Sequence, residues 1–258
     1  MPRFDPWLLV SLAFNFGFAS LMVSRRLRVK LRQILGLLPP PEAAWLRLPA
    51  KERFMNSPSH GGTVFLGDSL TSEAQLGELF GEAVAQKLLN APLLNRGVPG
   101  DTTSDVLARL DEVTARSPER ILLLIGANDL FQELEPEGIR DRLTTIWERV
   151  QSASPNTQLT LLSLIPVRES ARKLAGTNKK FANFNVVLEQ LARQRSLEFI
   201  DLFAAFVDHD GQLDSSLTYD NVHLKPAGYW VWRNAIVKSL EARASLLAQA
   251  RDSGGDLV

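Results

Sequence analysis

Apolar residues along the second part of the chain form two alternating kinds of block. Short runs rich in branched and aromatic residues have the length and composition of buried strands. Five such runs occur, at residues 63–66, 92–95, 121–125, 157–165 and 198–201. Between them, apolar residues recur at spacings of three and four, which is typical of amphipathic helices. The helical faces contain Leu76, Leu79 and Phe80; Val106, Leu107 and Leu110; Ile139, Leu143, Ile146, Trp147 and Val150; Phe181, Phe184, Leu188 and Leu191; and Trp232, Ile236 and Leu240.

This order of strands and helices predicts the fold class. Strands that alternate with helices pair in parallel and are joined by right-handed crossovers. The run at 121–125 is apolar throughout, as expected for a strand covered by helices on both faces. We therefore expect an α/β protein with three layers, α/β/α, around a central parallel sheet of about five strands.

The first part of the chain has a different pattern. Residues 7–23 carry no charge, and a basic cluster at residues 25–32 follows directly. The uncharged run is at the short end of the roughly 17–25 residues that span a bilayer. A cleavable signal peptide has its positive charge before the apolar run and a small-residue site after it, and this segment has neither feature clearly. We expect an uncleaved membrane-anchor helix, with a helix lying in the membrane interface as the alternative.

These patterns predict the organisation of the whole chain. Residues 1–35 form the anchor helix and its basic flank, residues 36–59 a linker, residues 60–250 the globular domain, and residues 251–258 a disordered tail. Because basic residues favour the cytoplasmic side, the globular domain is expected to face the cytoplasm.

Composition excludes several classes of function. The 29 basic and 29 acidic residues of the 258-residue chain balance, so nothing indicates a nucleic-acid partner. The chain has no cysteine, which excludes disulfides and thiolate catalysis. It has no histidine and carboxylate cluster with metal-ligand spacing and no nucleotide-binding fingerprint. We expect neither a metal nor a cofactor.

The first candidate for chemistry is Ser69, in the segment Gly67-Asp68-Ser69-Leu70. This segment follows the strand at 63–66 and precedes a helical block, so Ser69 lies on a tight strand-to-helix turn. Open α/β sheets place their sites at this end of a strand, where N–H groups of the helix start are also unpaired. A serine at such a position can also simply cap the helix.

Two further segments supply candidate hydrogen-bond donors. Gly97-Val98-Pro99-Gly100-Asp101 offers the N–H of Gly100, and Gly126-Ala127-Asn128-Asp129 offers the side-chain amide of Asn128. Together with the N–H of Ser69, these groups can stabilise an oxyanion. The alternatives are a plain loop glycine and an Asx-turn. Asp129 is expected to stabilise its loop.

The fourth segment, Asp220-Asn221-Val222-His223, supplies a base with an acidic partner. In a turn, a three-residue separation lets a carboxylate contact Nδ1 of the imidazole and leaves Nε2 free to take a proton from a serine. The other two histidines, His60 and His209, lie in polar, turn-like stretches and are expected on the surface.

In their order, these four segments resemble the four sequence blocks of the SGNH hydrolases, also called the GDSL esterase/lipase family. The family's serine, glycine, asparagine and histidine match Ser69, Gly100, Asn128 and His223, and the resemblance covers residues 60–245. It implies a flavodoxin-like fold, a triad of Ser69, His223 and Asp220, and an oxyanion hole. It leaves Asp68, Asp101 and Asp129 as supporting residues.

The resemblance implies a serine ester hydrolase that acts on small or lipid-like acyl esters, and here one tethered to a membrane. Members similar in the segment around Gly100 include lysophospholipases, thioesterases and acetylhydrolases. A carbohydrate O-deacetylase of the same family and a non-catalytic anchored binding module are the alternatives. The intact set of candidate residues argues against the binding module, which has no use for all of them.

Overall fold

The computed structural model describes residues 60–170 and 172–253. The expected anchor helix and linker therefore lie outside the described residues. Within the part that is described, no helix is both long enough and apolar enough to cross a membrane.

In this described part of the chain, five parallel strands form one sheet in the order β2-β1-β3-β4-β5. The strands are β1 (Thr63–Gly67), β2 (Leu93–Gly97), β3 (Arg120–Leu124), β4 (Gln158–Leu162) and β5 (Glu198–Ile200). This confirms the predicted α/β class and the parallel sheet of five strands.

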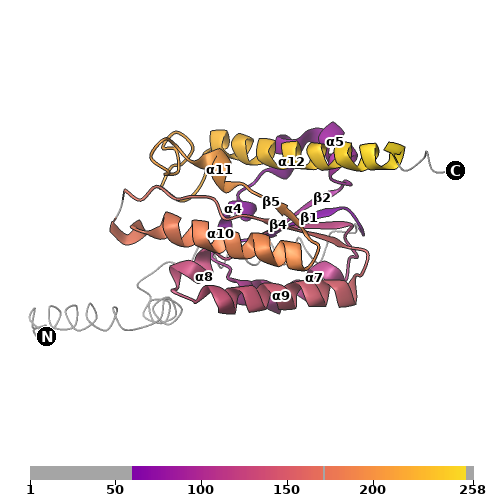
Figure 1. The fold of residues 1–258 in the computed structure, drawn as a ribbon, viewed down its shortest axis with the longest axis horizontal. Helices are drawn as coiled ribbons and strands as arrows, with labels where there is room; N and C mark the ends of the chain where they lie inside the picture. The colour runs from indigo at the N-terminus through magenta and orange to yellow at the C-terminus, as the bar shows by residue number, and fades with distance from the viewer. Residues whose placement is uncertain (1–59, 171, 254–258) are drawn as a thin grey trace, which may run out of the picture. The chain divides into compact units, whose positions relative to one another are not determined.

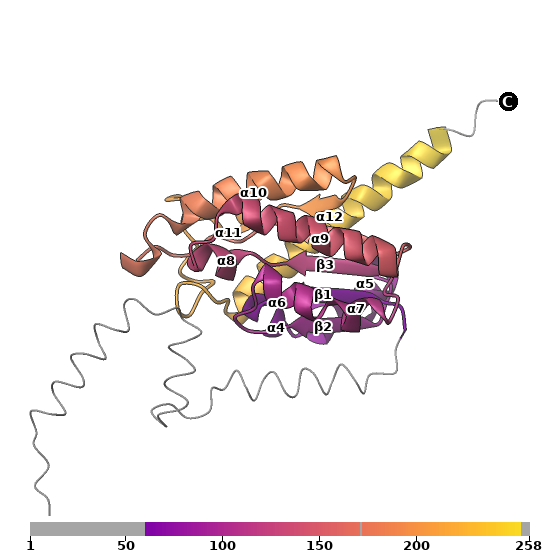
Figure 2. The same cartoon turned by 90° about the horizontal axis from the view of Figure 1, so that it is seen from below.

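Helices cover both faces of this sheet, as Figures 1 and 2 show. Helices α5 and α12 pack together on one face, and α9 packs with α6, α7 and α10 on the other. The helical elements are α4 (Ser69–Ser72), α5 (Leu76–Leu88), α6 (Thr103–Ala108), α7 (Leu110–Thr114), α8 (Ala127–Phe131), α9 (Pro136–Ala153), η1 (Arg172–Leu174), α10 (Thr177–Gln194), α11 (Phe203–Phe206) and α12 (Pro226–Ser253).

The core consists of the apolar faces that the sequence pattern predicts. On the α5 and α12 side, the Phe65 ring lies 5.3 Å from that of Phe80 and 5.5 Å from that of Trp232, measured between centroids. On the other side, Ile139 and Ile146 of α9 are fully buried. Burial of such side chains contributes about 1.5–3 kcal/mol each to folding.

One strand is shorter than its apolar run suggests. The run at 157–165 ends as a strand at Leu162, although Leu164 and Ile165 are buried. The Asn185 side chain of α10 accepts a hydrogen bond from the Leu164 N–H (2.8 Å) and donates one to the Leu164 carbonyl (2.9 Å). These bonds replace strand pairing there, so burial continues where the strand stops.

The carboxyl ends of β1, β2 and β3 bring three of the candidate segments together. Gly67 is paired with Gly97 on one side and with Leu124 on the other. After β1 the chain crosses to β2 on one side of it and then to β3 on its other side. The direction of winding therefore reverses at β1, and open α/β sheets bind ligands at the carboxyl ends of the strands at such a switch point. Both glycines are required for close packing, because a Cβ at Gly67 would overlap the Leu124 carbonyl and one at Gly97 would overlap the backbone of Ser72.

Candidate active site

Ser69 is the first residue of α4, directly after β1. The residue that caps this helix is Asp68, whose carboxylate accepts a hydrogen bond from the Leu70 N–H at 3.1 Å. Ser69 is therefore not the cap, which was the alternative role for it. Its hydroxyl instead lies 2.9 Å from Nε2 of His223, 154 residues further along the chain.

His223 has the acidic neighbour that the sequence spacing predicts. Its Nδ1 lies 2.6 Å from Oδ2 of Asp220, and the other carboxylate oxygen of Asp220 accepts the N–H groups of His223 (2.7 Å) and Val222 (3.0 Å). Partial burial raises the pKa of Asp220, but the hydrogen bonds from the His223 ring and from these backbone groups outweigh it and leave the pKa below its usual value. The carboxylate thus stays charged beside the imidazole.

Residues outside the four candidate segments contact His223 and hold it in place. The Tyr219 ring stacks on the imidazole, with centroids 5.9 Å apart and an interplanar angle of 16°, and its hydroxyl donates to the Glu73 carboxylate at 3.1 Å. The Thr218 hydroxyl donates to the His223 carbonyl at 2.7 Å. None of these three residues could be assigned a role from the sequence, since only the folded chain brings Glu73 next to Tyr219.

Asn128 reaches across to the other segments instead of bonding within its own turn. Its Nδ2 donates to the Asp101 carbonyl at 3.0 Å and lies 3.4 Å from Oδ2 of Asp68. The Leu130 N–H, which an Asx-turn at Asn128 would use, donates to the Gly126 carbonyl at 3.1 Å, so the alternative Asx-turn does not form. The Asn128 amide lies between Asp68, which precedes Ser69, and Asp101, which follows Gly100.

Gly100 lies in the turn after β2, which is attached to the turn that carries Ser69. The Val98 N–H donates to the Gly67 carbonyl at 3.0 Å, and the Asp101 N–H donates to the Val98 carbonyl at 3.1 Å. Gly100 has a φ of +79° and open space where a Cβ would be. Glycine is thus favoured here by its backbone conformation and not by crowding.

Three buried carboxylates, those of Asp68, Asp101 and Asp129, lie close to the candidate catalytic groups. Asp101 pairs with Arg109 at 2.8 Å, and Arg109 also donates to the Gly67 carbonyl at 3.1 Å. Asp129 accepts from the N–H (2.9 Å) and the hydroxyl (2.6 Å) of Thr103, so it ties α6 to α8 as a supporting residue. Burial raises the pKa of Asp129 despite these bonds.

Asp68 is the carboxylate next to Ser69 in the chain. Burial raises its pKa to about 7, and the nearby charges of Asp101 and Asp129 add to this effect. The Leu70 N–H and the His223 charge act in the opposite direction and are outweighed. Asp68 therefore changes its protonation near neutral pH, between the candidate nucleophile and the candidate oxyanion donor.

A small apolar cavity adjoins Asp68, with a volume of about 20 Å³. It lies beside the Asn128 segment and the loop after β4. Its lining comprises Asp68, Leu70, Leu124, Ala127, Phe131, Leu164, Ile165, Pro166, Val167, Phe181 and Val222. A cavity of this size holds about one water molecule or one methyl group.

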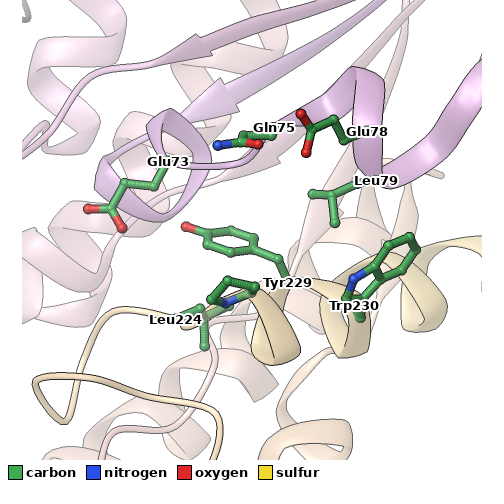
Figure 3. Close-up of a pocket in the computed structure, with 8 residues that line it drawn as sticks. Glu73, Gln75, Glu78, Leu79, Leu224, Tyr229 and Trp230 are labelled. Atoms are coloured by element: carbon green, nitrogen blue, oxygen red, sulfur yellow. The ribbon is translucent and has the colours of Figure 1, made fainter.

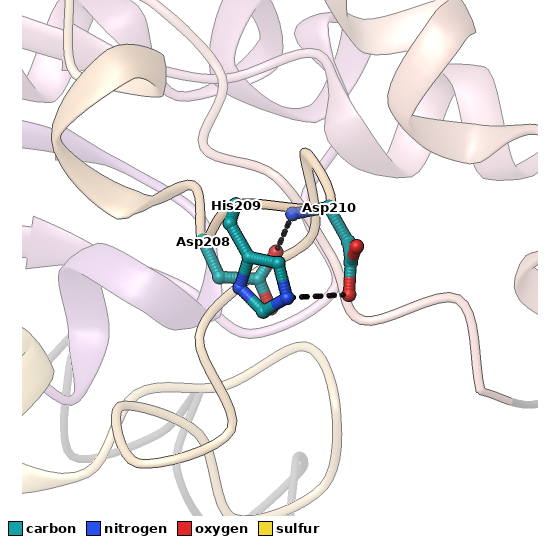
Figure 4. Close-up of side chains that lie close together, drawn as sticks. All are labelled: Asp208, His209 and Asp210. Carbon is teal, nitrogen blue, oxygen red and sulfur yellow. Dashed lines mark hydrogen bonds and ion pairs between the residues drawn. The ribbon is translucent and has the colours of Figure 1, made fainter.

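Among the described residues, Asp208, His209 and Asp210 have donor atoms close enough together to hold a metal ion (Figure 4). The Asp208 carboxylate already accepts the N–H groups of Asp210 (2.9 Å) and Gln212 (3.0 Å) and pairs with Arg168 at 3.0 Å. His209 is exposed, as the sequence predicts. A turn and an ion pair account for this cluster, and we assign no metal to it.

Comparisons with known proteins support the resemblance seen in the sequence. The model of the GDSL-like lipase/acylhydrolase family matches residues 65–231. The platelet-activating factor acetylhydrolase IB subunit alpha2 of Rattus norvegicus is 29% identical over 171 residues, which cover 64% of this chain and 70% of that protein. An acetylxylan esterase of Geobacillus stearothermophilus is 23% identical over 203 residues, 69% of this chain and 92% of that one.

Solved structures show the same fold. A protein from Streptococcus pneumonia, described as a candidate platelet activating factor, superposes with a TM-score of 0.68 and 27% identity, covering 84% of this chain and all of that one. A GDSL-like lipase from Bacteroides thetaiotaomicron has a TM-score of 0.64 at 19% identity, covering 78% and 99%. The matched residues include all four candidate segments complete, and so the chain belongs to the GDSL-like lipase/acylhydrolase family of carboxylic ester hydrolases.

Proposed function

We propose that the enzyme hydrolyses esters of short acyl groups with Ser69 as nucleophile, His223 as base and Asp220 as the group that orients the base. The observation that carries this proposal is the continuous set of contacts from Asp220 through both nitrogens of His223 to the Ser69 hydroxyl. A charged carboxylate at Nδ1 fixes the tautomer in which Nε2 can accept a proton.

In the proposed first step, Ser69 Oγ bonds to the ester carbonyl carbon and its proton passes to Nε2 of His223. The C–O bond to the alcohol then breaks, and the imidazolium gives that proton to the leaving oxygen. Water, deprotonated by the same imidazole, attacks the acyl carbon. The bond from that carbon to Ser69 Oγ breaks, the imidazolium returns its proton to Oγ, and the acid is released. Asp220 stabilises the imidazolium in both halves without taking the proton.

Three donors are available for the negative charge on the carbonyl oxygen. They are the N–H of Ser69 at the start of α4, the N–H of Gly100 and Nδ2 of Asn128. The 3.4 Å contact of Asn128 with Asp68 is long for a hydrogen bond, so a substrate oxygen can replace it at small cost.

The size of the acyl group follows from the cavity beside Asp68. That cavity of about 20 Å³ is lined by Asp68 next to Ser69, by Ala127 next to Asn128 and by Val222 next to His223, so it adjoins the proposed reacting groups and is the space for the acyl chain. It admits an acetyl group and excludes long chains. Similarity to acetylhydrolases and an acetylxylan esterase supports the same conclusion.

The experiment that tests this function is a panel of 4-nitrophenyl esters from acetyl to octanoyl, assayed with three proteins. The wild type should hydrolyse the acetyl ester with the highest kcat/KM. Ser69→Ala should lower kcat by about 10³-fold or more, while Ser72→Ala, one turn along the same helix, should leave it unchanged. Hydrolysis that survives Ser69→Ala would contradict the assignment.

A second candidate is the removal of O-acetyl groups from a carbohydrate, which similarity to the acetylxylan esterase favours. The two candidates use the same residues and differ in the alcohol. Acetate release from acetylated xylo-oligosaccharides at a kcat/KM above that for simple alkyl acetates would favour the carbohydrate esterase.

We also propose that residues 1–35 tether the enzyme to a membrane, with the catalytic domain on the cytoplasmic side. The support is the uncharged run at residues 7–23 and its basic flank. Such a tether brings the site close to esters that partition into membranes.

A further inference from the structure

A second, larger cavity lies beside the candidate active site, with a volume of about 320 Å³. Figure 3 shows that Glu73, Gln75 and Glu78 reach it from the α4 and α5 segment, opposite Tyr229 and Trp230 at the start of α12. Leu79, Leu224 and Pro226 complete the lining. This cavity is distinct from the small one beside Asp68 and is large enough for a substituted alkyl group.

The cavity adjoins the His223 side of Ser69. The Glu73 N–H donates to the Ser69 carbonyl at 3.0 Å, and the Glu73 carboxylate accepts from Tyr219, whose ring stacks on His223. Leu224, on the other wall, follows His223 in the chain. Because His223 returns the proton to the departing oxygen, this is the side on which the alcohol half of the ester lies.

The lining has the chemistry of a site for an organic cation. It contains two carboxylates, Glu73 and Glu78, and the described residues that form it include no lysine or arginine. Trp230 is half exposed (50%), whereas Tyr229 is buried, with its ring between Glu73 and Leu224. Aromatic faces attract ammonium groups, and adjacent carboxylates strengthen that attraction and repel anions.

We propose that this cavity binds the ammonium group of a cationic alcohol, such as choline, which leaves from the ester. The proposal rests on the proposed function and adds to it the class of leaving group. The acyl group lies beside Asp68, the ester carbon at Ser69, and the ammonium between Glu78 and Trp230. Neutral alcohols of the same shape fit the space but lose the attraction of the two carboxylates.

Two esters of equal shape test the proposal, acetylcholine and 3,3-dimethylbutyl acetate, which differ only in the positive charge. At one fixed ionic strength, the full chain should have a kcat/KM for acetylcholine about tenfold or more above that for the neutral ester. A ratio of one or below would overturn the proposal.

Two glutamates of α5 supply the matched variants. Glu78→Gln should lower the ratio of the two kcat/KM values about fivefold or more, mainly through the KM for acetylcholine. Glu82→Gln, exposed on α5 and outside the cavity lining, should leave the ratio unchanged. Equal ratios for wild type and Glu78→Gln would overturn the assignment of this cavity.

A binding measurement separates this proposal from the proposed function. If neither ester is hydrolysed, the assignment of Ser69 as nucleophile fails. Saturation-transfer NMR of choline with the full chain then shows whether the cavity binds the cation. Saturation of the choline methyl protons that decreases in Glu78→Gln supports the proposal. Absence of saturation with the wild type overturns it.

Discussion

Asn128 and Asp68 show how single residues set up the site. Asn128 has its amide fixed between the Asp101 carbonyl and the Asp68 carboxylate, so its N–H groups are already aimed at the Ser69 turn. Asp68 has its backbone in that turn and its carboxylate buried beneath it. Asp68 therefore links the position of the proposed nucleophile, Ser69, to that of the proposed oxyanion donor, Asn128.

Asn128→Ala removes the proposed side-chain donor. We expect kcat for an acetyl ester to fall on the order of 10²–10³-fold with a small change in KM, because this bond strengthens as charge develops in the transition state. Steady-state kinetics at neutral pH measure the effect, and Asn183→Ala, exposed on α10, is the control. A loss confined to KM would contradict the oxyanion role.

Asp68 should make stability depend on pH. Its folded pKa of about 7 lies above its unfolded value of about 4, so the folded protein holds one proton more than the unfolded chain between these values. Stability from this group is thus complete below pH 4 and is lost as the pH rises to 7, by up to about 1.4 kcal/mol per pH unit. Urea unfolding of the wild type and of Asp68→Asn should show this loss in the wild type alone. Parallel pH profiles would show that Asp68 does not titrate in this way.

The residues that could be predicted from the sequence are those inside contiguous motifs. Ser69, Asp220 and His223 lie in such tetrapeptides, and the three-residue spacing of Asp220 and His223 indicates how these two meet. Arg109 and Glu73 could not be assigned, because their contacts with Asp101 and Tyr219 depend on how separate elements pack. Contacts of this kind between separate elements have no local sequence signature.

Helix α10 determines how the chain continues beyond β4. Asn185 on its buried face forms two hydrogen bonds with Leu164, and Asn178 accepts from the Val167 N–H at 2.7 Å. These bonds satisfy the backbone beside the small cavity without a strand. The apolar pattern predicts burial there but not the end of the strand, because the pattern does not show which group pairs with the backbone.

Asn185→Ala should therefore destabilise the protein more than an ordinary surface change. It leaves the N–H and the carbonyl of Leu164 buried without partners, and we expect a loss of about 2–4 kcal/mol in the free energy of unfolding. Asn183→Ala, exposed on the same helix, should change it by about 0.5 kcal/mol or less. Similar losses from both variants in urea titrations would contradict this account of the β4 loop.

For the molecule as a whole, the sheet order explains why residues from distant parts of the chain meet. The pairing of β1 with both β2 and β3 places three segments at one edge, and the loop before α12 brings His223 to the same edge. Alternation of strands and helices was enough to predict the parallel sheet, but it does not give the order of the strands. The expected anchor lies in residues that the structure does not describe, so the tether is proposed from sequence alone.

The tether predicts how the intact protein behaves. The full chain should sediment with membranes and resist extraction by high salt, because burial of an apolar helix is not screened by ions. A shortened chain that begins at Glu52 should remain in solution and keep its esterase activity, since the described domain has its own core. Release of the full chain by salt alone would favour a peripheral helix, and recovery of a shortened mature form outside the cytoplasm would indicate a signal peptide.

The proposed function requires above all that His223 and Asp220 activate Ser69. Mass spectrometry of the protein after reaction with a fluorophosphonate tests it most directly, because this reagent bonds only to an activated hydroxyl. We predict one adduct, on the peptide that contains Ser69, formed on the order of 10³-fold more slowly in His223→Ala. An adduct on another serine, or a rate that His223→Ala does not change, would contradict the account.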